Sequence, residues 1–347
     1  MSTMKILLTG GTGTLGTAII DKILNDNHRN VKNVSEIRIF SRNEKDQTDM
    51  KRRYEGNLNC LLGDVRDYEA IFRAIREVDV VIHAAAIKHI DVAEVNPDEA
   101  IKTNIIGTQN VLKSAAALGV KKLINISTDK TCNPHSTYGA TKLIAERLTS
   151  AMAAECKSDF MTCRFGNILG SSGSVFSLWK NLIHKGRSIP ITHKEMTRFF
   201  IRIDTAAEFV LDILSETKPG SIFVPKLNSF AMLQLASSLM GDSESVGFDE
   251  IGLRPGEKIH EDLVNESELE KAIFTTDFIS LMPEIPNSFS EKIEFSKENS
   301  VDVEIRTQGK LKSDIVNDLS SDFERFQGKY AITNFEMKEI LNKIPFN

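Results

Sequence analysis

Tyr138 and Lys142 are the two residues whose types and spacing best suit a chemical step. Because they are four positions apart, their side chains would lie on one face of a helix, about one turn apart. The ammonium of Lys142 would then lower the pKa of the phenol. The pair predicts a tyrosine that acts as a base and takes the proton of an alcohol while the alcohol is oxidised.

A second acid and amine, Asp129 and Lys130, follow the apolar run 122–128, which we expect to form a strand. An alcohol oxidation alone would not need them, so they indicate a further proton transfer. A lysine can act as a base only if burial or a neighbouring cation lowers its pKa, and we expect Lys142 to supply that charge. The alternative is an ion pair at a strand end; the nearby Tyr138 favours chemistry.

A glycine-rich turn lies between the first expected strand and an expected helix. Glycine lets the backbone approach a pyrophosphate, and the helix N-terminus presents unpaired N–H groups and a positive dipole to it. The flanking strand and helix favour this interpretation over a turn without a ligand. The expected contacts of a dinucleotide are Gly10, Thr12, Gly13, Thr14, Leu15 and Gly16.

The second expected strand ends in Ser41 and Arg42, with no carboxylate at its tip. A carboxylate would bind the ribose diol of NAD, whereas Ser41 and Arg42 suit a 2′-phosphate. Lys45 adds positive charge nearby. We therefore expect NADP as the cofactor.

Further cofactor contacts are expected at the ends of the third and fourth strands. Asp64 is a candidate partner of the adenine amino group. The small residues Ala84, Ala85 and Ala86 would let the chain pass close to the cofactor. His83, just before them, is expected to be a packed residue rather than a catalyst.

Short β-rich runs alternate with helical segments up to about residue 165. This alternation predicts an α/β fold, a Rossmann-like doubly wound parallel sheet with a smaller C-terminal lobe. We expect residues 1–165 to bind NADP, with 199–225 packing back on them, and residues 166–198 and 226–347 to form the substrate-binding lobe and a C-terminal extension. The expected strands are 5–9, 36–40, 59–62, 78–82, 122–126 and 160–164, and later helices are expected at 176–185, 205–216 and 334–344.

The composition excludes several other classes of protein. A net charge of −5 gives no electrostatic footprint for nucleic acid or an anionic membrane surface. No stretch approaches the roughly 18 apolar residues that span a bilayer, and the N-terminus shows no cleavable signal, so we expect a cytoplasmic protein. The four cysteines have no metal-ligand spacing, which favours reduced thiols and no metal site.

Taken together, the glycine turn, the alanine run and the Tyr138–Lys142 pair resemble the extended short-chain dehydrogenase/reductases. Narrower motifs in the stretch 5–264 resemble the soluble UDP-N-acetylglucosamine 4,6-dehydratases that invert C5. These motifs are Ser41-Arg42-Asn-Glu, Gly63-Asp-Val-Arg-Asp67, His83-Ala-Ala-Ala-Ile-Lys88-His89, Lys102-Thr-Asn-Ile-Ile-Gly107, Ser127-Thr-Asp-Lys130, Asn133-Pro134, Met196-Thr-Arg-Phe199 and Gly252-Leu-Arg-Pro-Gly-Glu-Lys-Ile-His-Glu261.

The resemblance implies a 4-keto-6-deoxy product on the route to pseudaminic acid or related surface sugars. It implies that Tyr138, with Lys142 and Thr128 beside it, takes the O4 proton, that Lys130 takes the C5 proton, and that Asp129 protonates the leaving C6 hydroxyl. Lysine at position 130, where a retaining dehydratase has a carboxylate, favours inversion. The resemblance also adds Val65 and Asn104 to the cofactor contacts and implies a homo-oligomer.

The resemblance further implies a set of contacts to a UDP-N-acetylhexosamine. Any of the charged members could instead be a solvated side chain or part of a structural ion pair. Two rival functions stay open: a nucleotide-sugar 4-epimerase or reductase that does not use the elimination pair, and a non-catalytic NADP-binding regulator. The expected substrate contacts are Lys88, Asn167, Val175, Arg198, Arg254 and Glu257.

Overall fold

A nine-stranded sheet forms the centre of the protein in this computed structural model, which describes residues 3–25, 28–55, 58–169, 175–240, 247–283 and 329–343. Seven strands run parallel, and β13 and β14 join antiparallel at one edge. In sheet order the strands are β13 (Ala272–Phe274), β14 (Phe278–Leu281), β10 (Ile222–Pro225), β6 (Asp159–Phe165), β5 (Lys122–Thr128), β4 (Val80–His83), β1 (Met4–Thr9), β2 (Val34–Ser41) and β3 (Leu58–Leu62).

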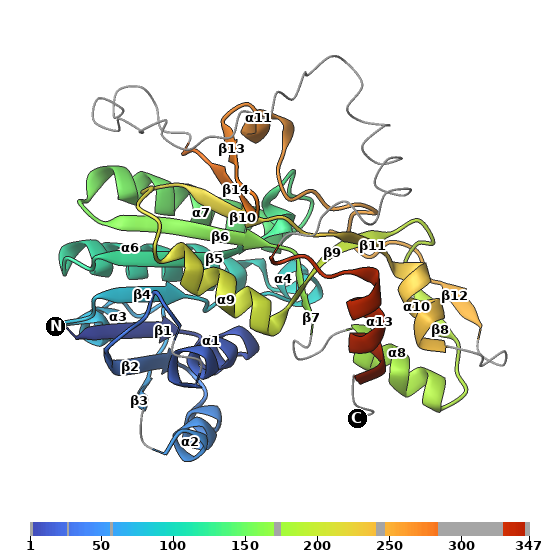
Figure 1. Ribbon diagram of the computed structural model, residues 1–347, viewed down its shortest axis with the longest axis horizontal. Coiled ribbons are helices and arrows are strands. Elements are labelled where there is room, and N and C mark those ends of the chain that lie inside the picture. The colour runs from blue at the N-terminus through green and yellow to red at the C-terminus, as the bar shows by residue number, and fades with distance from the viewer. Residues whose placement is uncertain are drawn as a thin grey trace.

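Helices cover both faces of this sheet, because its central strands are apolar on both sides. One layer contains α1 (Thr14–Asn25), α2 (Glu44–Arg53) and α9 (Ile203–Ile213), which share a core cluster through Ile19, Met50 and Phe209. The other layer contains α3 (Tyr68–Ile75), α6 (Gly107–Ala117) and α7 (Thr137–Glu155), which share a second cluster. Figure 1 shows α1 and α9 lying across one face of the sheet.

Short helical segments fill the connections beside the site. The connection from β4 to α6 is helical along most of its length, and a single turn follows β5. They are α4 (Ile90–Val95), α5 (Pro97–Ala100), the π-helical turn η1 (Ile101–Ile106), the 3₁₀ turn η2 (Asp129–Thr131) and α11 (Glu266–Leu269).

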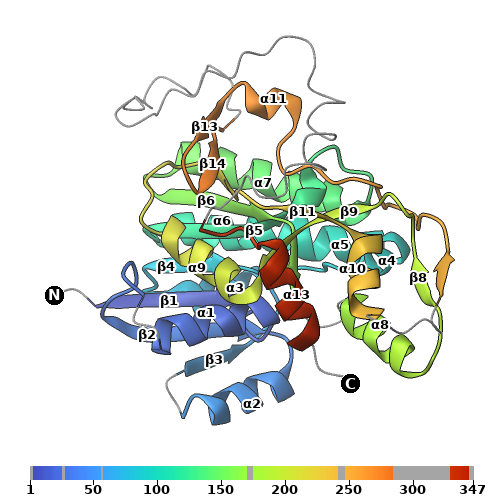
Figure 2. The same cartoon turned by 45° about the vertical axis from the view of Figure 1, so that its right-hand side comes forward.

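A smaller lobe lies beyond the carboxyl ends of the strands (Figure 1). It has its own core around Trp179, Phe200 and Phe230. The C-terminal helix α13 packs against α10, as Figure 2 shows from a second direction. The elements of this lobe are β7 (Asn167–Leu169), α8 (Val175–His184), β8 (Ile189–Ile191), β9 (Thr197–Arg202), β11 (Ser229–Ala231), α10 (Met232–Met240), β12 (Phe248–Glu250) and α13 (Asn334–Lys343).

The expected strands and helices all appear, with their ends shifted by a few residues. Within the expected segment 199–225, α9 and β10 pack on the large sheet, whereas residues 199–202 belong to β9 of the smaller lobe. Residues 226–347 were expected to form the substrate lobe and a C-terminal extension, but β13 and β14 extend the large sheet beside β10. Their pairing brings the segment that precedes them, 252–269, back across the site.

Candidate active site

A cavity of about 950 Å³ lies at the carboxyl ends of the parallel strands, the usual ligand site of a doubly wound sheet. It runs from the glycine turn to the smaller lobe. Most of the residues expected from the sequence line it. These are Gly10, Thr12, Gly13, Thr14, Leu15, Gly16, Ser41, Arg42, Asp64, Val65, Ala84, Ala85, Ala86, Lys88, Thr128, Lys130, Tyr138, Lys142, Asn167, Val175, Arg254 and Glu257.

The glycine turn needs its glycines for two separate reasons. Gly10 has φ +67°, and a Cβ on it would lie 2.8 Å from the backbone nitrogen of Ala85. A Cβ on Gly16 would overlap the carbonyl of Gly11, so Gly16 lets helix α1 begin directly against the turn. The chain therefore brings two loops together at the end of β1 and leaves the start of α1 open to the cavity.

Four expected site residues do not line this cavity. Lys45 is exposed on α2, and Asp129 is fully buried behind the wall. Arg198 lines a smaller adjoining cavity of about 160 Å³. Its guanidinium donates to the carbonyls of Thr197, Ile259 and Lys258, so much of its hydrogen-bonding capacity already holds the segment 252–261 in place.

Asn104 is the fourth, and its expected role as a cofactor contact stays a prediction, because its side chain does not line the cavity. Its side chain is completely buried in η1, with its amide already paired. Oδ1 accepts from the Ile87 N–H at 2.8 Å, and Nδ2 donates to the Ile87 carbonyl and to Thr141 Oγ1, both at 3.0 Å. Asn104 therefore ties the loop after β4 to helix α7 and positions two walls of the cavity.

The end of the cavity beside β2 and β3 carries an exposed positive charge. Arg42 is well exposed, and its Nη1 lies 3.8 Å from Asp64 Oδ2. The Asp64 carboxylate accepts three hydrogen bonds from Arg66. Burial raises the pKa of Asp64, but Arg66 outweighs it and the net pKa is lowered. Asp64 is thus committed to Arg66, whereas Arg42 has room to meet an anion.

The turn of residues 128–131 at the end of β5 is called the catalytic turn here, after the role expected of its residues. It places Thr128, Asp129 and Lys130 in one hydrogen-bonded group. Asp129 Oδ1 accepts from Thr128 Oγ1 at 3.0 Å and from Lys130 Nζ at 2.9 Å. Lys130 Nζ also donates to Asn167 Oδ1 at 3.3 Å. Its side chain is 14% exposed and lines both cavities, so the amine faces the space that a substrate would occupy.

Helix α7 brings Tyr138 against this turn. The helix is capped by the Ser136 hydroxyl, which accepts from the Gly139 N–H at 3.0 Å. A Cβ on Gly139 would overlap the carbonyl oxygen of Lys130. Only glycine at this position lets the first turn of α7 pack on the catalytic turn.

The electrostatics of the Tyr138 phenol differ from the expectation. Burial raises its pKa, the charge of Lys130 and a hydrogen bond with Thr128 lower it, and Asp129 raises it; the net pKa is raised. The cation whose charge lowers the phenol pKa is thus Lys130 rather than Lys142, and the expected catalytic and cofactor-binding roles of Lys142 stay predictions. Burial lowers the pKa of Lys142 to about 8, against the charge of Glu146.

In the protein alone the pKa of Lys130 is raised rather than depressed. Burial lowers this pKa, but the charges of Asp129 and Glu261 raise it by more than burial lowers it, so the net pKa is raised. Glu261 Oε1 lies 3.7 Å from Lys130 Nζ. Sequence reasoning included Glu261 in a motif but gave it no role, because the motif alone does not show that residue 261 faces residue 130.

His83 is a packed residue, as expected. Its ring nitrogens lie 2.6 Å from Thr9 Oγ1 and 2.9 Å from Thr108 Oγ1. Burial, with the charge of Lys142, lowers its pKa to about 3. The ring is therefore neutral at ordinary pH and connects β1, β4 and α6 beneath the cavity.

A family model described as "Polysaccharide biosynthesis protein" matches residues 6–283. The chain belongs to the polysaccharide biosynthesis protein family. A relative from Campylobacter jejuni subsp. jejuni serotype O:23/36, named UDP-N-acetylglucosamine 4,6-dehydratase (inverting), is 42% identical over 81% of this chain and 83% of its own length. That similarity confirms the resemblance drawn from the motifs.

Two further comparisons extend the picture of this polysaccharide biosynthesis family member. A UDP-glucose 4-epimerase of Rickettsia akari is 39% identical over 77% of this chain and 79% of its own length. The solved structure of Pen from Bacillus thuringiensis matches with a TM-score of 0.76 and 34% identity, over 82% of this chain and 90% of that one. The expected Rossmann-like α/β fold is confirmed.

No helix among the described residues is long and apolar enough to cross a bilayer.

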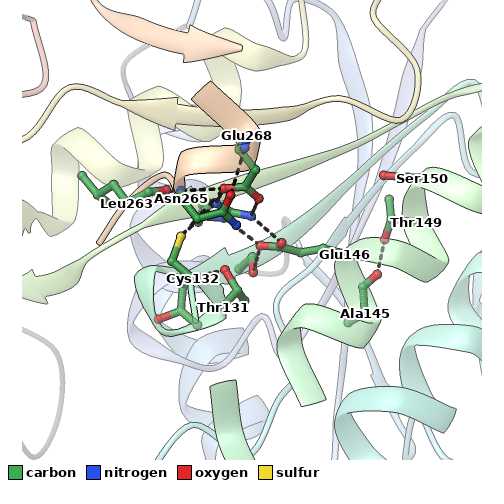
Figure 3. A network of polar contacts seen from close by, with 12 residues as sticks. Thr131, Cys132, Ala145, Glu146, Thr149, Ser150, Leu263, Asn265 and Glu268 are labelled. Atoms are coloured by element: carbon green, nitrogen blue, oxygen red, sulfur yellow. Dashed lines mark hydrogen bonds and ion pairs between the residues drawn. The ribbon is translucent and has the colours of Figure 1, made fainter. Parts of the chain in front are cut away.

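In this family member a buried arginine joins helix α7 to the segment that crosses the site. Figure 3 shows Glu146 of α7 near Leu263 and Glu268 of that segment. Arg164, at the end of β6, is completely buried, and Glu146 and Glu268 each accept two hydrogen bonds from it, at 2.7–3.1 Å. It also donates to the Leu263 carbonyl at 3.0 Å. Because Glu146 lies one turn beyond Lys142 on α7, this network fixes the helix that carries both Tyr138 and Lys142.

Proposed function

We propose that this protein is an NADP-dependent UDP-N-acetylglucosamine 4,6-dehydratase that inverts C5. The observation that carries the proposal is the group of Tyr138, Asp129 and Lys130 at one wall of a dinucleotide-type cavity. Oxidation at C4 needs one base, and elimination across C5 and C6 needs a second base and an acid. The product would be UDP-2-acetamido-2,6-dideoxy-β-L-arabino-hex-4-ulose, a precursor of surface or flagellin glycans.

The residues divide the reaction into proton transfers. Bound NADP⁺ would accept the hydride from C4 and return it to C6. Tyr138 takes the O4 proton, so a ketone forms at C4 and acidifies the C5 proton. Lys130 then takes the C5 proton. Asp129 lies behind the cavity wall, so it gives a proton to the departing C6 hydroxyl through the Thr128 hydroxyl, which lies 3.0 Å from Asp129 Oδ1 and lines the cavity. A proton from solvent then reaches C5 from the opposite face as the hydride returns to C6, and this inverts that centre.

The ion pair of Lys130 and Asp129 is the starting state for this elimination. The ammonium is not yet a base, and the carboxylate is not yet an acid. Transfer of one proton over the 2.9 Å hydrogen bond from Lys130 Nζ to Asp129 Oδ1 produces the neutral amine and the carboxylic acid together. The two residues then have the protonation states that the elimination requires, with no proton taken from solvent.

The cofactor preference rests on charge at the adenosine end. The glycine turn and the start of α1 would hold the pyrophosphate, and Tyr138 and Lys142 would lie at the nicotinamide end. Arg42 lines the cavity, is well exposed, and has only a 3.8 Å contact to Asp64. A guanidinium in that position favours the 2′-phosphate of NADP over the diol of NAD.

A nucleotide-sugar 4-epimerase is the second candidate, favoured by the similarity to the Rickettsia akari relative. Such an enzyme uses the Tyr138 base and needs no elimination pair. Lys130 discriminates between the two functions, because its replacement in an epimerase would remove only a charge beside the Tyr138 phenol, whereas in a dehydratase it would also remove the base of the elimination. A non-catalytic NADP-binding regulator would turn over neither sugar.

The test is an incubation of the purified protein with NADP⁺ and UDP-N-acetylglucosamine in deuterated water, followed by proton NMR. A new C6 methyl signal, deuterium at C5 and the couplings of the L-arabino ring would support the proposal. A 4-epimer that keeps its C6 hydroxyl would show that the protein is an epimerase. An unchanged sugar would favour the non-catalytic NADP-binding regulator.

A further inference from the structure

Glu261 is a buried carboxylate on the segment that crosses the site. Its side chain is 2% exposed, and Oε1 lies 3.7 Å from Lys130 Nζ. Its other oxygen, Oε2, lies 3.1 Å from Lys258 Nζ but has no hydrogen bond of good geometry. A carboxylate held out of water needs close cations, and Lys130 and Lys258 fill that need here.

The groups around Lys130 come from five parts of the chain. Asp129 lies on the same turn, Tyr138 on α7, Asn167 on β7, Arg198 on β9, and Glu261 on the segment after β12. Carboxylate oxygens of Asp129 and Glu261 lie 2.9 Å and 3.7 Å from the amine, with the Asn167 amide oxygen as a third contact. The position of Nζ is defined by three oxygen atoms, two of which belong to carboxylates.

Lys258 ties Glu261 to the catalytic turn independently of Lys130. Its side chain is 10% exposed, and its Nζ donates to the Cys132 carbonyl at 2.7 Å. Cys132 directly follows the turn that carries Asp129 and Lys130. The carboxylate therefore cannot move away from the turn without breaking this second connection.

We propose that Glu261 is a positioning residue that holds the Lys130 amine toward the sugar and stabilises the ammonium that forms when Lys130 takes the C5 proton. This inference rests on the proposed dehydration. Asp129 cannot do the same work alone, because it becomes neutral when it accepts the Lys130 proton. Glu261 then remains as the anion beside Nζ throughout the elimination.

The first test measures Lys130 without any sugar. The ¹³C signal of the lysine Cε atoms is followed by NMR as a function of pH in protein labelled at lysine, and Lys130→Arg identifies the signal of Lys130. In Glu261→Gln, which keeps the shape but removes the charge, the Lys130 titration should move down by about one pH unit or more. Glu261→Asp should restore part of the lost shift in the Lys130 titration, and the exposed Glu69→Gln should leave the Lys130 titration unchanged. An unchanged titration in folded Glu261→Gln would overturn the proposal.

The second test measures the reaction. In Glu261→Gln the elimination should slow by about tenfold or more, and the limb of its pH–rate profile that belongs to Lys130 should move to lower pH. A loss of rate with an unmoved profile would show a merely structural tie and overturn the proposal. If the wild-type protein does not dehydrate the sugar, the proposed function fails, while the NMR titration still decides whether Glu261 controls Lys130.

Discussion

The carbonyl oxygen of Lys130 occupies the space that a side chain on Gly139 would need. These residues belong to different elements, the turn after β5 and the first turn of α7. One side of this contact is Lys130 itself, and Tyr138 directly precedes Gly139 on the other side. The contact therefore sets the distance between the Tyr138 phenol and the Lys130 amine. Several outcomes can be predicted from this and related contacts.

Gly139→Ala should leave a folded protein with a misplaced catalytic turn. A methyl group cannot fit against the Lys130 carbonyl, so the turn or the helix must shift. Displacement of about 1 Å at a catalytic group costs roughly 100-fold in rate, and we expect at least that loss in sugar turnover. Gly119→Ala is the control: its positive φ makes the substitution strained, but no atom lies within 4 Å of the new Cβ. Full activity in Gly139→Ala would contradict the packing described here.

Lys130→Met should separate the two halves of the reaction. Without the amine the elimination should fall by about 10²- to 10⁴-fold. Reduction of NADP⁺ on mixing with the sugar should fall much less, because that half loses only the charge of Lys130 beside the Tyr138 phenol. Absorbance of the reduced cofactor and NMR of the C6 methyl group measure the two halves. The exposed Lys113→Met serves as control. Methyl formation at the wild-type rate would rule out a role of Lys130 in the elimination.

Arg42→Ala should weaken NADP⁺ binding without weakening NAD⁺ binding. Loss of a charge-assisted contact to the 2′-phosphate costs about 1.5–3 kcal/mol, or roughly 10- to 100-fold in Kd. Titration calorimetry with both cofactors measures the change. Lys45→Ala should change the Kd much less, because Lys45 does not line the cavity. Equal weakening for both cofactors would argue against NADP.

Arg164→Met should lower the free energy of unfolding by about 3–5 kcal/mol, because it leaves the buried carboxylates of Glu146 and Glu268 without their cation. Urea unfolding followed by circular dichroism measures this change. The exposed Arg73→Met provides the comparison for loss of an arginine at the surface. A difference below about 1 kcal/mol from that control would show that the buried network contributes little to stability.

His83 should make the stability of the protein depend on pH. The unfolded chain takes up a proton on this residue near pH 6.5, whereas the folded state resists until about pH 3. The stability that comes from the neutral ring is therefore present above pH 6.5 and declines below it, by about 1.4 kcal/mol per pH unit. Between pH 7 and pH 5, His83→Asn should lose about 2 kcal/mol less than the wild type in urea unfolding. Parallel losses in both proteins would contradict the low pKa.

Local patterns explain how much of the site was predictable. The glycine turn, the end of β5 and the Tyr138–Lys142 spacing each depend on residues close together in the chain, and the carboxyl ends of parallel strands meet at one edge of the sheet. These rules placed most of the expected contacts around one cavity. They did not indicate that Asn104 is buried, because its burial and its pairing with Ile87 and Thr141 depend on how η1 packs.

The sequence by itself determined the fold class, the dinucleotide turn and the identity of the amine, the acid and the phenol. Only the tertiary structure decided the direction in which the pKa values of Tyr138 and Lys130 are shifted. It brings Glu261 from 131 positions along the chain to Lys130, because β13 and β14 pair beside β10 and draw the preceding segment across the site. A pKa depends on every charge within a few ångströms, and such neighbours are set by packing rather than by spacing. The direction of the Lys130 pKa therefore could not be read from its local motif.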